Sequence, residues 1–414
     1  MSRIAESPSP DSGANPRREP GFREFVTLIA GLMALNALAI DAMVPALPEI
    51  GRALAVAGEN ERQLVVTFYM LGFGATQLLY GPLSDRYGRK PVLIASLVLY
   101  VVFALLCAAA GSFVLLLAAR MAQGAAAASS RVLTVSIVRD RFEGPRMARL
   151  MSLAFMTFML IPVLAPMFGQ LTLLVASWRA IFFGLALFAA IMLVWSLIRL
   201  PETLHPEHRR PFSARAISEA ARETVSNRQA IGYTMGFTLM VGALMGYIMS
   251  IQQIVFDVFK RPELIAIAFA GIAGPMALTS YLNSRLVERL GSRRIGHIGL
   301  TLFTLLSLVH LAVSASGTEN LTFFILLQSL TMACFGLSSA NFGSLAMQPL
   351  GHVAGTASSV QGTISTIGGA LLGSAIGQSF DGTTVPLTAG FALCGAMSML
   401  ILLATERGRL FQRL

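Results

Sequence analysis

Residues Gly81 to Pro91 read Gly-Pro-Leu-Ser-Asp-Arg-Tyr-Gly-Arg-Lys-Pro and lie between two long apolar segments. The stretch holds one carboxylate and three basic side chains, whereas the residues on both sides of it suit lipid. Gly88 permits a turn with positive φ, and Pro91 suits the first turn of a helix. These residues therefore predict a short charged connection between two membrane-spanning helices.

The composition indicates the same class of protein. Of 414 residues, 55% are hydrophobic and 13% are charged, whereas soluble domains carry about 25% charged residues. Many separate apolar runs of about 20 residues predict an all-α polytopic membrane protein, and strict alternation of apolar and polar residues, as in a β-barrel, is absent from these runs. The three cysteines (Cys107, Cys334, Cys394) lie in apolar runs, and with five scattered histidines they predict neither disulfides nor a metal site.

Twelve membrane-spanning helices are expected, in two six-helix halves. The predicted spans are 24–46, 62–82, 91–110, 113–138, 147–171, 178–200, 230–256, 263–285, 295–315, 320–345, 355–380 and 385–406. A polar linker at 201–229 separates the halves and is expected to hold an amphipathic helix near 213–225. The halves then cover 24–200 and 230–406, between a disordered polar tail at 1–23 and a short tail at 407–414.

The basic residues predict which side of the membrane each connection faces. If both termini are cytoplasmic, 24 of the 31 arginines and lysines fall in inner segments, five in outer segments and two inside a span. Cytoplasmic loops of membrane proteins carry such an excess. We therefore expect both termini in the cytoplasm of a multi-pass plasma-membrane protein, with a bacterial inner membrane as its location. The net charge of +10 then faces anionic lipid and not nucleic acid.

The second half repeats the charged connection of the first. Residues 288–294 read Glu-Arg-Leu-Gly-Ser-Arg-Arg, and Gly291 lies 203 residues after Gly88. Two half-repeats with a binding site at their interface are typical of transporters. The chain has two lysines, Lys90 and Lys260, and neither follows the glycine spacing of a nucleotide-binding loop. We therefore expect a secondary transporter that needs no cofactor and no metal.

One carboxylate stands out from the others. Of 21 acidic residues, 20 fall in tails, in loops or at span ends, and Asp41 lies within the first span. A carboxylate at membrane depth indicates a functional site. Burial favours its uncharged form, which suits a group that binds and releases protons. The alternative is a hydrated carboxylate near the outer surface.

Two arginines of the fourth span complete the charged set. Arg120 lies at a depth similar to that of Asp41, counting about 1.5 Å per residue along each helix, so the two helices bring an acid and a base to one level. Arg131 follows eleven residues later, almost on the same helix face, and either lines the inner part of the same cavity or extends to the cytoplasmic surface. Other polar candidates at membrane depth are Tyr69, Gln77, Gln123, Gln252, Asn341 and Gln361.

These motifs resemble those of the major facilitator superfamily. Its signature connection between spans two and three is matched at Gly81, Leu83, Asp85, Arg86, Gly88, Arg89 and Lys90. The resemblance implies that this connection gates the transport pathway, and we expect Asp85 to pair with a basic residue or a helix N-terminus in only one gate state. Residues 120–124 also resemble the Arg-x-x-x-Gly motif of the family's fourth span.

A further motif resembles that of antiporters within this superfamily. In the fifth span, Pro162, Pro166 and Gly169 resemble the antiporter signature, whereas Ala165 and Gln170 stand in place of two of its glycines. Proline and small residues permit close packing and a bend between neighbouring spans. The resemblance therefore favours exchange of substrate for protons.

Several shorter stretches resemble one branch of the superfamily, the bicyclomycin/chloramphenicol-resistance drug:proton antiporters. They are residues 39–48, 138–142, 178–182, 201–204 and 351–359. The resemblance implies the major facilitator fold and transport driven by the proton gradient. The expected function is proton-coupled efflux of small, mostly apolar drug-like compounds by a monomer that is not an enzyme. Its partners would be substrate, protons and membrane lipid. A metabolite importer or facilitator and a transport-inactive membrane sensor are the alternatives.

Overall fold

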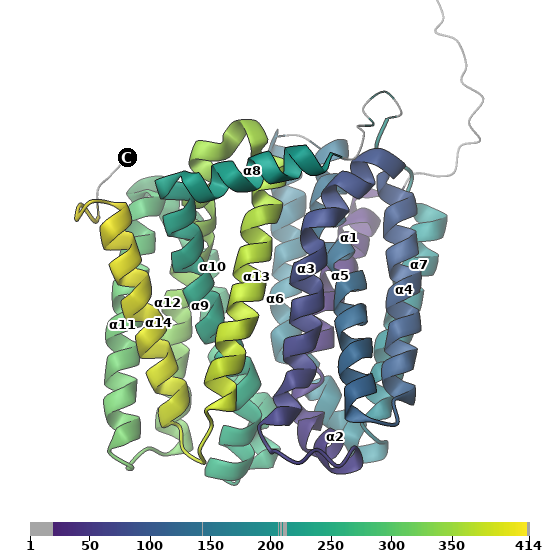
Figure 1. Ribbon diagram of the computed structural model, residues 1–414. Coiled ribbons are helices and arrows are strands. Elements are labelled where there is room, and N and C mark those ends of the chain that lie inside the picture. Colours follow the sequence, from purple (N-terminus) through teal and green to yellow (C-terminus); the bar gives the residue numbers. More distant parts are fainter. Residues whose placement is uncertain (1–19, 143, 206, 208, 210–212, 412–414) are drawn as a thin grey trace, which may run out of the picture.

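The computed structural model describes residues 20–142, 144–205, 207, 209 and 213–411. Within these residues the chain is all-helical, and its long helices form one bundle (Figure 1). The first six are α1 (Phe22–Asp41), α3 (Leu64–Tyr87), α4 (Arg89–Ala109), α5 (Phe113–Arg141), α6 (Gly144–Val175) and α7 (Arg179–Arg199). The second six are α9 (Arg228–Gln253), α10 (Ile265–Leu290), α11 (Ser292–Ala315), α12 (Leu321–Met347), α13 (Ala354–Gln378) and α14 (Val385–Thr405). The predicted all-α fold is confirmed.

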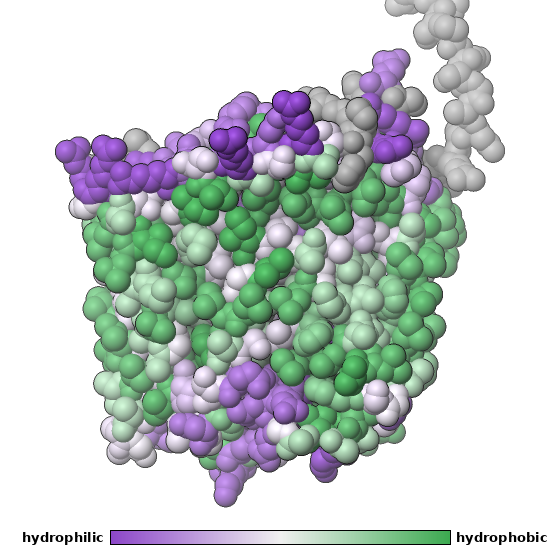
Figure 2. Space-filling view, in the orientation of Figure 1, coloured by the Kyte–Doolittle hydropathy of each residue, from purple (hydrophilic) through white to green (hydrophobic). Residues whose placement is uncertain are grey.

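The long helices match a membrane in length and hydropathy. Ten helical segments of the described residues are long and apolar enough to cross one. One of these, Leu321–Gln378, contains both α12 and α13, and α6 is a further long helix, so the described part of the chain holds twelve long helices. On the side shown in Figure 2, an apolar band lies between two polar ends. The end that carries α8 (Ala214–Ser226) is named the α8 face, and the end with α2 (Leu47–Ala53) the far face.

The two halves repeat the same interhelical contact. In the first half, the Thr76 hydroxyl of α3 donates a hydrogen bond of 2.9 Å to the Ala125 carbonyl of α5. In the second half, the Thr279 hydroxyl of α10 donates a hydrogen bond of 2.7 Å to the Ala333 carbonyl of α12. Each bond joins the second span of a half to its fourth span. The halves are therefore pseudo-symmetric, as the repeated connection predicts.

The charged connection is shorter than the sequence suggests. α3 continues through Tyr87 and α4 begins at Arg89, so most of residues 81–90 is helical. Between the two helices lies Gly88, with φ +100°, and Gly291 repeats this arrangement with φ +80°. Only glycine adopts this backbone region without strain. The two spans can therefore extend as helices until a single glycine reverses the chain.

The helices pack mainly within each half. Across the boundary between the halves, α3 packs against α13 and α6 packs against α10. The linker helix α8 lies near the region where the sequence predicts an amphipathic helix, and it contacts α9 and α13. Of the two predicted tails, residues 1–19 and 412–414 lie outside the described residues, and α1 begins at Phe22. The boundary between the halves is therefore formed mainly by the pairs α3–α13 and α6–α10.

Candidate functional site

The first span ends at the candidate carboxylate. α1 ends at Asp41 and is followed by the short helix η1 (Val44–Ala46). Pro45 of η1 has no backbone N–H and so cannot continue the backbone hydrogen bonds of α1. The Asp41 side chain is 4% exposed and has no hydrogen-bond or ion-pair partner among the described residues. η1 packs against α9 of the other half, and Tyr247 of α9 lies within electrostatic range of Asp41. The carboxyl group therefore lies at the boundary between the halves.

Arg120 of α5 is completely buried and forms hydrogen bonds to two neighbouring helices. Its guanidinium group donates hydrogen bonds to the Val65 carbonyl of α3 (3.1 Å), the Ala39 carbonyl of α1 (3.1 Å) and the Gln123 side chain of α5 (2.9 Å). It also lies over the Tyr69 ring, 4.3 Å from the ring centroid. Charge-assisted hydrogen bonds are roughly twice as strong as neutral ones. Arg120 therefore fixes α1 and α3 against α5.

Asp41 and Arg120 lie close in the fold but have different partners. Arg120 binds the carbonyl of Ala39, which precedes Asp41 by two residues in α1. No salt bridge of the described residues joins these two side chains, and the Arg120 guanidinium binds two backbone carbonyls and the Gln123 side chain instead. Arg120 thus positions the segment that carries the carboxyl group and does not neutralise it.

Two glycines of the predicted motifs let helices touch backbone to backbone. A Cβ atom added at Gly169 of α6 would lie 2.2 Å from the carbonyl oxygen of Ala42, the residue after Asp41. A Cβ atom added at Gly124 of α5 would lie 1.9 Å from the carbonyl oxygen of Tyr69. Such distances are too short for real contacts, so both positions exclude a larger residue. Each glycine therefore holds its helix against a segment that carries a candidate side chain.

The two motif prolines of α6 and Arg131 of α5 have different surroundings. Pro162 is half-buried and Pro166 is buried, both within α6. Pro166 precedes Gly169 by three residues, and α6 packs against α1. Arg131 has an exposed side chain and is separate from the contacts of Arg120. The antiporter motif thus lies beside Asp41, whereas Arg131 does not.

The signature connection is organised around Arg89, which is 4% exposed. Its guanidinium group lies 2.6 Å from the Asp85 carboxylate and 3.0 Å from the Asp140 carboxylate, and it donates a hydrogen bond of 2.6 Å to the Ser84 hydroxyl. The Glu202 carboxylate accepts a hydrogen bond of 2.9 Å from the backbone N–H of Arg89. A carboxylate is favourable there because Arg89 begins α4. The connection therefore ties α3 and α4 to the end of α5 and to the segment after α7.

The remaining signature residues face outward or toward the neighbouring helices. Arg86 is exposed and lies over the Tyr87 ring, 5.1 Å from its centroid. The Lys90 ammonium group donates a hydrogen bond of 2.9 Å to the Leu197 carbonyl of α7. Leu83 is half-buried. Asp85 thus pairs with Arg89 of its own connection in this arrangement.

Polar side chains and glycine mark the contact between α3 and α13. The Gln77 side chain accepts a hydrogen bond of 3.4 Å from the Thr366 hydroxyl across the boundary, and Gln361 is buried on α13. A Cβ atom at Gly81 would lie 3.9 Å from the Ser359 hydroxyl of α13. The signature connection therefore begins where the two halves meet.

Replacing Gly88 with alanine is expected to lower both the melting temperature and the transport rate. The added Cβ atom would lie 2.4 Å from the Glu202 carboxylate, and φ +100° is strained for alanine, at a cost of about 1–3 kcal/mol. Thermal unfolding in detergent and initial transport rates measure the effect. Gly111→Ala is the matched control, because a Cβ atom there meets no atom within 4 Å. Equal melting temperatures for the two variants would contradict the role of Gly88.

The other predicted polar candidates divide into two groups. Tyr69 and Gln123 belong to the cluster around the buried arginine of α5. Gln252 is buried on α9, and neither atom of its side-chain amide has a hydrogen-bond partner among the described residues. Asn341 donates a hydrogen bond of 2.8 Å to Asn283 within the second half, so it joins α12 to α10. The structure therefore brings two of these four residues to the Arg120 cluster.

A cluster of side-chain amides joins the two halves at the far face, and none of these contacts is predicted from the sequence. Asn60 donates to the Gln378 carbonyl (3.0 Å), and the Gln378 side chain donates to the Asn60 carbonyl (2.7 Å). Gln253 donates to the Asn60 side chain (2.7 Å), and Gln63 bonds to Gln253. Beside this cluster, the Arg62 guanidinium of the first half forms an ion pair of 3.6 Å with a carboxylate of the second half. Amides near span ends resemble ordinary surface groups, so their sequence positions carry no signal.

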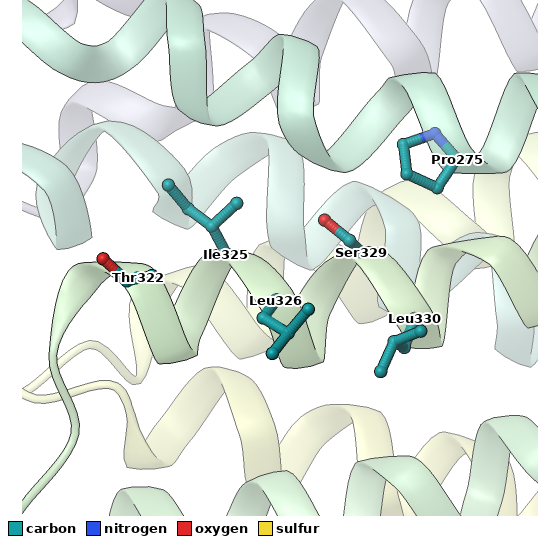
Figure 3. Close-up of a pocket in the computed structure, with 6 residues that line it drawn as sticks. All are labelled: Pro275, Thr322, Ile325, Leu326, Ser329 and Leu330. Carbon is teal, nitrogen blue, oxygen red and sulfur yellow. The ribbon is translucent and has the colours of Figure 1, made fainter.

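Two surface hollows of the described residues lie elsewhere. One lies between α10 and α12 and is lined by Pro275, Thr322, Ile325, Leu326, Ser329 and Leu330 (Figure 3). Another lies on α7 and is lined by Ala190, Ile191, Val194 and Trp195. Both are apolar and hold no charged side chain, and exposed leucines of this kind suit contact with lipid. We therefore place the candidate site at the boundary between the halves.

A comparison with protein families covers both halves and this boundary. Residues 29–373 match the Major Facilitator Superfamily. The chain belongs to this superfamily. As a member of the Major Facilitator Superfamily it is a multi-pass membrane transporter and not an enzyme, and the predicted family resemblance is confirmed.

Relatives within the superfamily resemble nearly the whole chain. It is 29% identical over 410 residues to the multidrug resistance protein MdtL of Klebsiella pneumoniae, which covers 94% of this chain and 97% of that protein. It is 26% identical over 382 residues to the bicyclomycin resistance protein homolog of Haemophilus influenzae, with 91% and 94% covered. Its fold is similar to that of a D-xylose-proton symporter, with a TM-score of 0.70, 13% identity, and 95% and 99% covered. The last likeness concerns the fold alone.

Proposed function

We propose that this transporter exports small, mostly apolar, drug-like compounds in exchange for protons by alternating access. The observation that carries the proposal is Asp41, a buried carboxyl group without a partner among the described residues, at the boundary between the halves. A carboxyl group in such a place gains or loses a proton as its access to water changes. Export is supported by relatives whose names include multidrug and bicyclomycin resistance.

The contacts at the boundary support a rocking motion of the two halves. The amide cluster around Asn60 closes the far face, so a compound in the pathway would exchange with the α8 face in this arrangement. Opening the far face would break these hydrogen bonds and give water on that side access to Asp41. Gly169 and Arg120 both contact the backbone beside Asp41, so a shift of α6 or α5 would reach the carboxyl group.

We further propose that the α8 face is cytoplasmic, in a bacterial inner membrane. The excess of arginine and lysine in the segments on that side supports this orientation. Alkaline phosphatase fused after Glu202 or after Arg409 is then expected to be inactive, and after Gly111 active, because the enzyme works only outside the cytoplasm. Green fluorescent protein at the same positions should give the reverse pattern. An active phosphatase at Glu202 or Arg409 would contradict the orientation.

Transport driven by a pH gradient tests the proposed exchange. The purified protein is placed in liposomes with an acidic or an alkaline lumen, and uptake of radiolabelled chloramphenicol is followed. Exchange for protons predicts accumulation in the acid-loaded liposomes, because protons leave as the compound enters. Accumulation in the alkaline-loaded liposomes instead would indicate symport, as in a metabolite importer. If chloramphenicol reached the same level in acid-loaded and alkaline-loaded liposomes, and this level equalled that in liposomes without protein, proton coupling would be contradicted.

A further inference from the structure

The chain after the last span folds back onto the bundle and docks on one buried histidine. α14 ends at Thr405, and residues 406–411, named the C-terminal segment, continue at the α8 face (Figure 1). The backbone N–H of Phe411 donates a hydrogen bond of 3.1 Å to Nδ1 of His297 in α11. The Phe411 ring packs edge-on against the imidazole ring, with 5.9 Å between the ring centroids. The C-terminal segment is therefore attached to His297, which is 1% exposed.

The backbone of the C-terminal segment has angles that need support. Arg407 has φ +53° and Phe411 has φ +66°, a region that residues other than glycine adopt at an energetic cost. Such angles persist where surrounding contacts hold them. The contacts of Phe411 with His297 are of this kind. Losing them would let the C-terminal segment leave this conformation.

The hydrogen bonds of His297 fix which ring nitrogen carries a proton. Nδ1 accepts from the Phe411 N–H, so Nδ1 itself carries no proton. The neutral ring then has its proton on Nε2 and donates it to the Tyr233 hydroxyl of α9, 2.9 Å away. The Tyr233 hydroxyl donates its own proton to the Glu406 carboxylate at 2.6 Å. The arrangement therefore requires a neutral His297.

Two opposite charges act on His297 from the elements around it. The Glu406 carboxylate follows α14, and the Arg293 guanidinium lies one turn earlier in α11. These two groups form an ion pair of 3.1 Å. α9 contributes the Tyr233 hydroxyl, and α12 contributes the apolar Phe342 ring, which packs against Tyr233. Because the two charges are paired with each other, the acceptor at Nδ1 is the feature that an added proton changes most.

We propose that His297 is a pH-sensitive latch for the C-terminal segment. A proton on Nδ1 turns the acceptor of the Phe411 N–H into a second donor, so this hydrogen bond is lost and two N–H groups face each other. The bond from Nε2 to Tyr233 is kept, because Nε2 donates in both forms of the ring. Imidazole is the side chain that ordinarily changes charge near neutral pH. The segment is therefore docked at higher pH and released as the pH on the α8 side falls, whether or not the proposed exchange is correct.

The mobility of a spin label on the C-terminal segment tests the latch. Arg409 is exposed, and Arg409→Cys carries the nitroxide in full-length protein whose buried cysteines (Cys107, Cys334, Cys394) are replaced by alanine. Spectra are recorded in lipid nanodiscs between about pH 8 and about pH 5. With His297 present, the label is expected to be immobile at high pH and mobile at low pH. His297→Asn should abolish this response and leave the label immobile, because its side-chain oxygen can replace Nδ1 as acceptor and does not titrate.

Two further variants separate the latch from other effects of pH. Phe411→Pro has no backbone N–H and cannot adopt a positive φ, so its label should be mobile at every pH while the buried bonds of His297 stay intact. His352→Asn is the matched control, because His352 also lies at the α8 face but is 64% exposed and pairs with Glu223 at 2.9 Å. This control should keep the full pH response.

Three results would overturn the latch. The first is equal mobility of the label at every pH when His297 is present. The second is an unchanged pH response in His297→Asn, which would assign the response to another group. The third is an immobile label at high pH in Phe411→Pro, which would show that the hydrogen bond to His297 does not hold the C-terminal segment.

Discussion

Replacing Asp41 with asparagine is expected to abolish pH-driven accumulation of substrate without unfolding the protein. Asparagine has nearly the same shape as aspartate but cannot release a proton. A gradient of one pH unit stores about 1.4 kcal/mol per proton, so one-for-one exchange concentrates the substrate about tenfold. In the variant the ratio of inside to outside concentration should fall to about one. Substrate binding at equilibrium should persist, because no other described residue depends on a bond from Asp41.

The measurement is the accumulation of chloramphenicol in acid-loaded liposomes. Glu219→Gln is the matched control, because the Glu219 side chain is 63% exposed and pairs with Arg215 of its own helix α8, so its loss removes a carboxylate away from Asp41. That variant should accumulate substrate as the wild type does. Normal pH-driven accumulation by Asp41→Asn would show that protons cross by another route.

Removing the Arg120 side chain is expected to impair both binding and transport. Arg120→Ala deletes three hydrogen bonds from a charged donor, each contributing about 1.5–3 kcal/mol. α1 would then lose its attachment to α5 two residues before Asp41. We expect the transport rate to fall on the order of 100-fold, equivalent to about 2.8 kcal/mol. Arg120→Lys keeps the charge but not the planar fork of donors, so its rate should be intermediate.

Three measurements separate positioning by Arg120 from a general loss of structure. They are the melting temperature, the affinity for chloramphenicol and the initial rate of exchange. Partial rescue of the rate by lysine at an unchanged melting temperature is the expected signature of positioning. If Arg120→Ala retained wild-type affinity and rate, the three hydrogen bonds would serve packing only.

Most of the fold follows from the cost of burying polar groups in lipid. Apolar runs of about 20 residues predict the spans because each must cross the hydrocarbon layer as a helix. Gly88 and Gly291 predict the turns because few other residues tolerate their backbone angles. The helical state of residues 81–87 was less predictable, since charged residues near a membrane surface suit a helix end as well as a loop. In the structure, α3 continues as a helix to Tyr87.

The candidate site was only partly predictable. Asp41 and Arg120 can be identified from the sequence because charges in apolar spans are costly and therefore rare. The partners of Arg120 carry no such signal, because two of them are backbone carbonyls, which every residue has. The contact between Asn60 and Gln378 joins residues 318 positions apart. It depends on how the halves dock, which no local pattern encodes.

The closure of the far face has an electrical consequence. Asn60, Gln63, Gln253 and Gln378 are joined there by hydrogen bonds between neutral groups, so separating them moves no net charge through the membrane potential. The ion pair beside them consists of two opposite charges, which together also carry no net charge. A full charge that crosses the membrane exchanges about 2.3 kcal/mol per 100 mV. The opening of this face therefore takes nearly the same free energy at any voltage. Under the proposed exchange, the voltage acts on the cycle through the proton bound to Asp41.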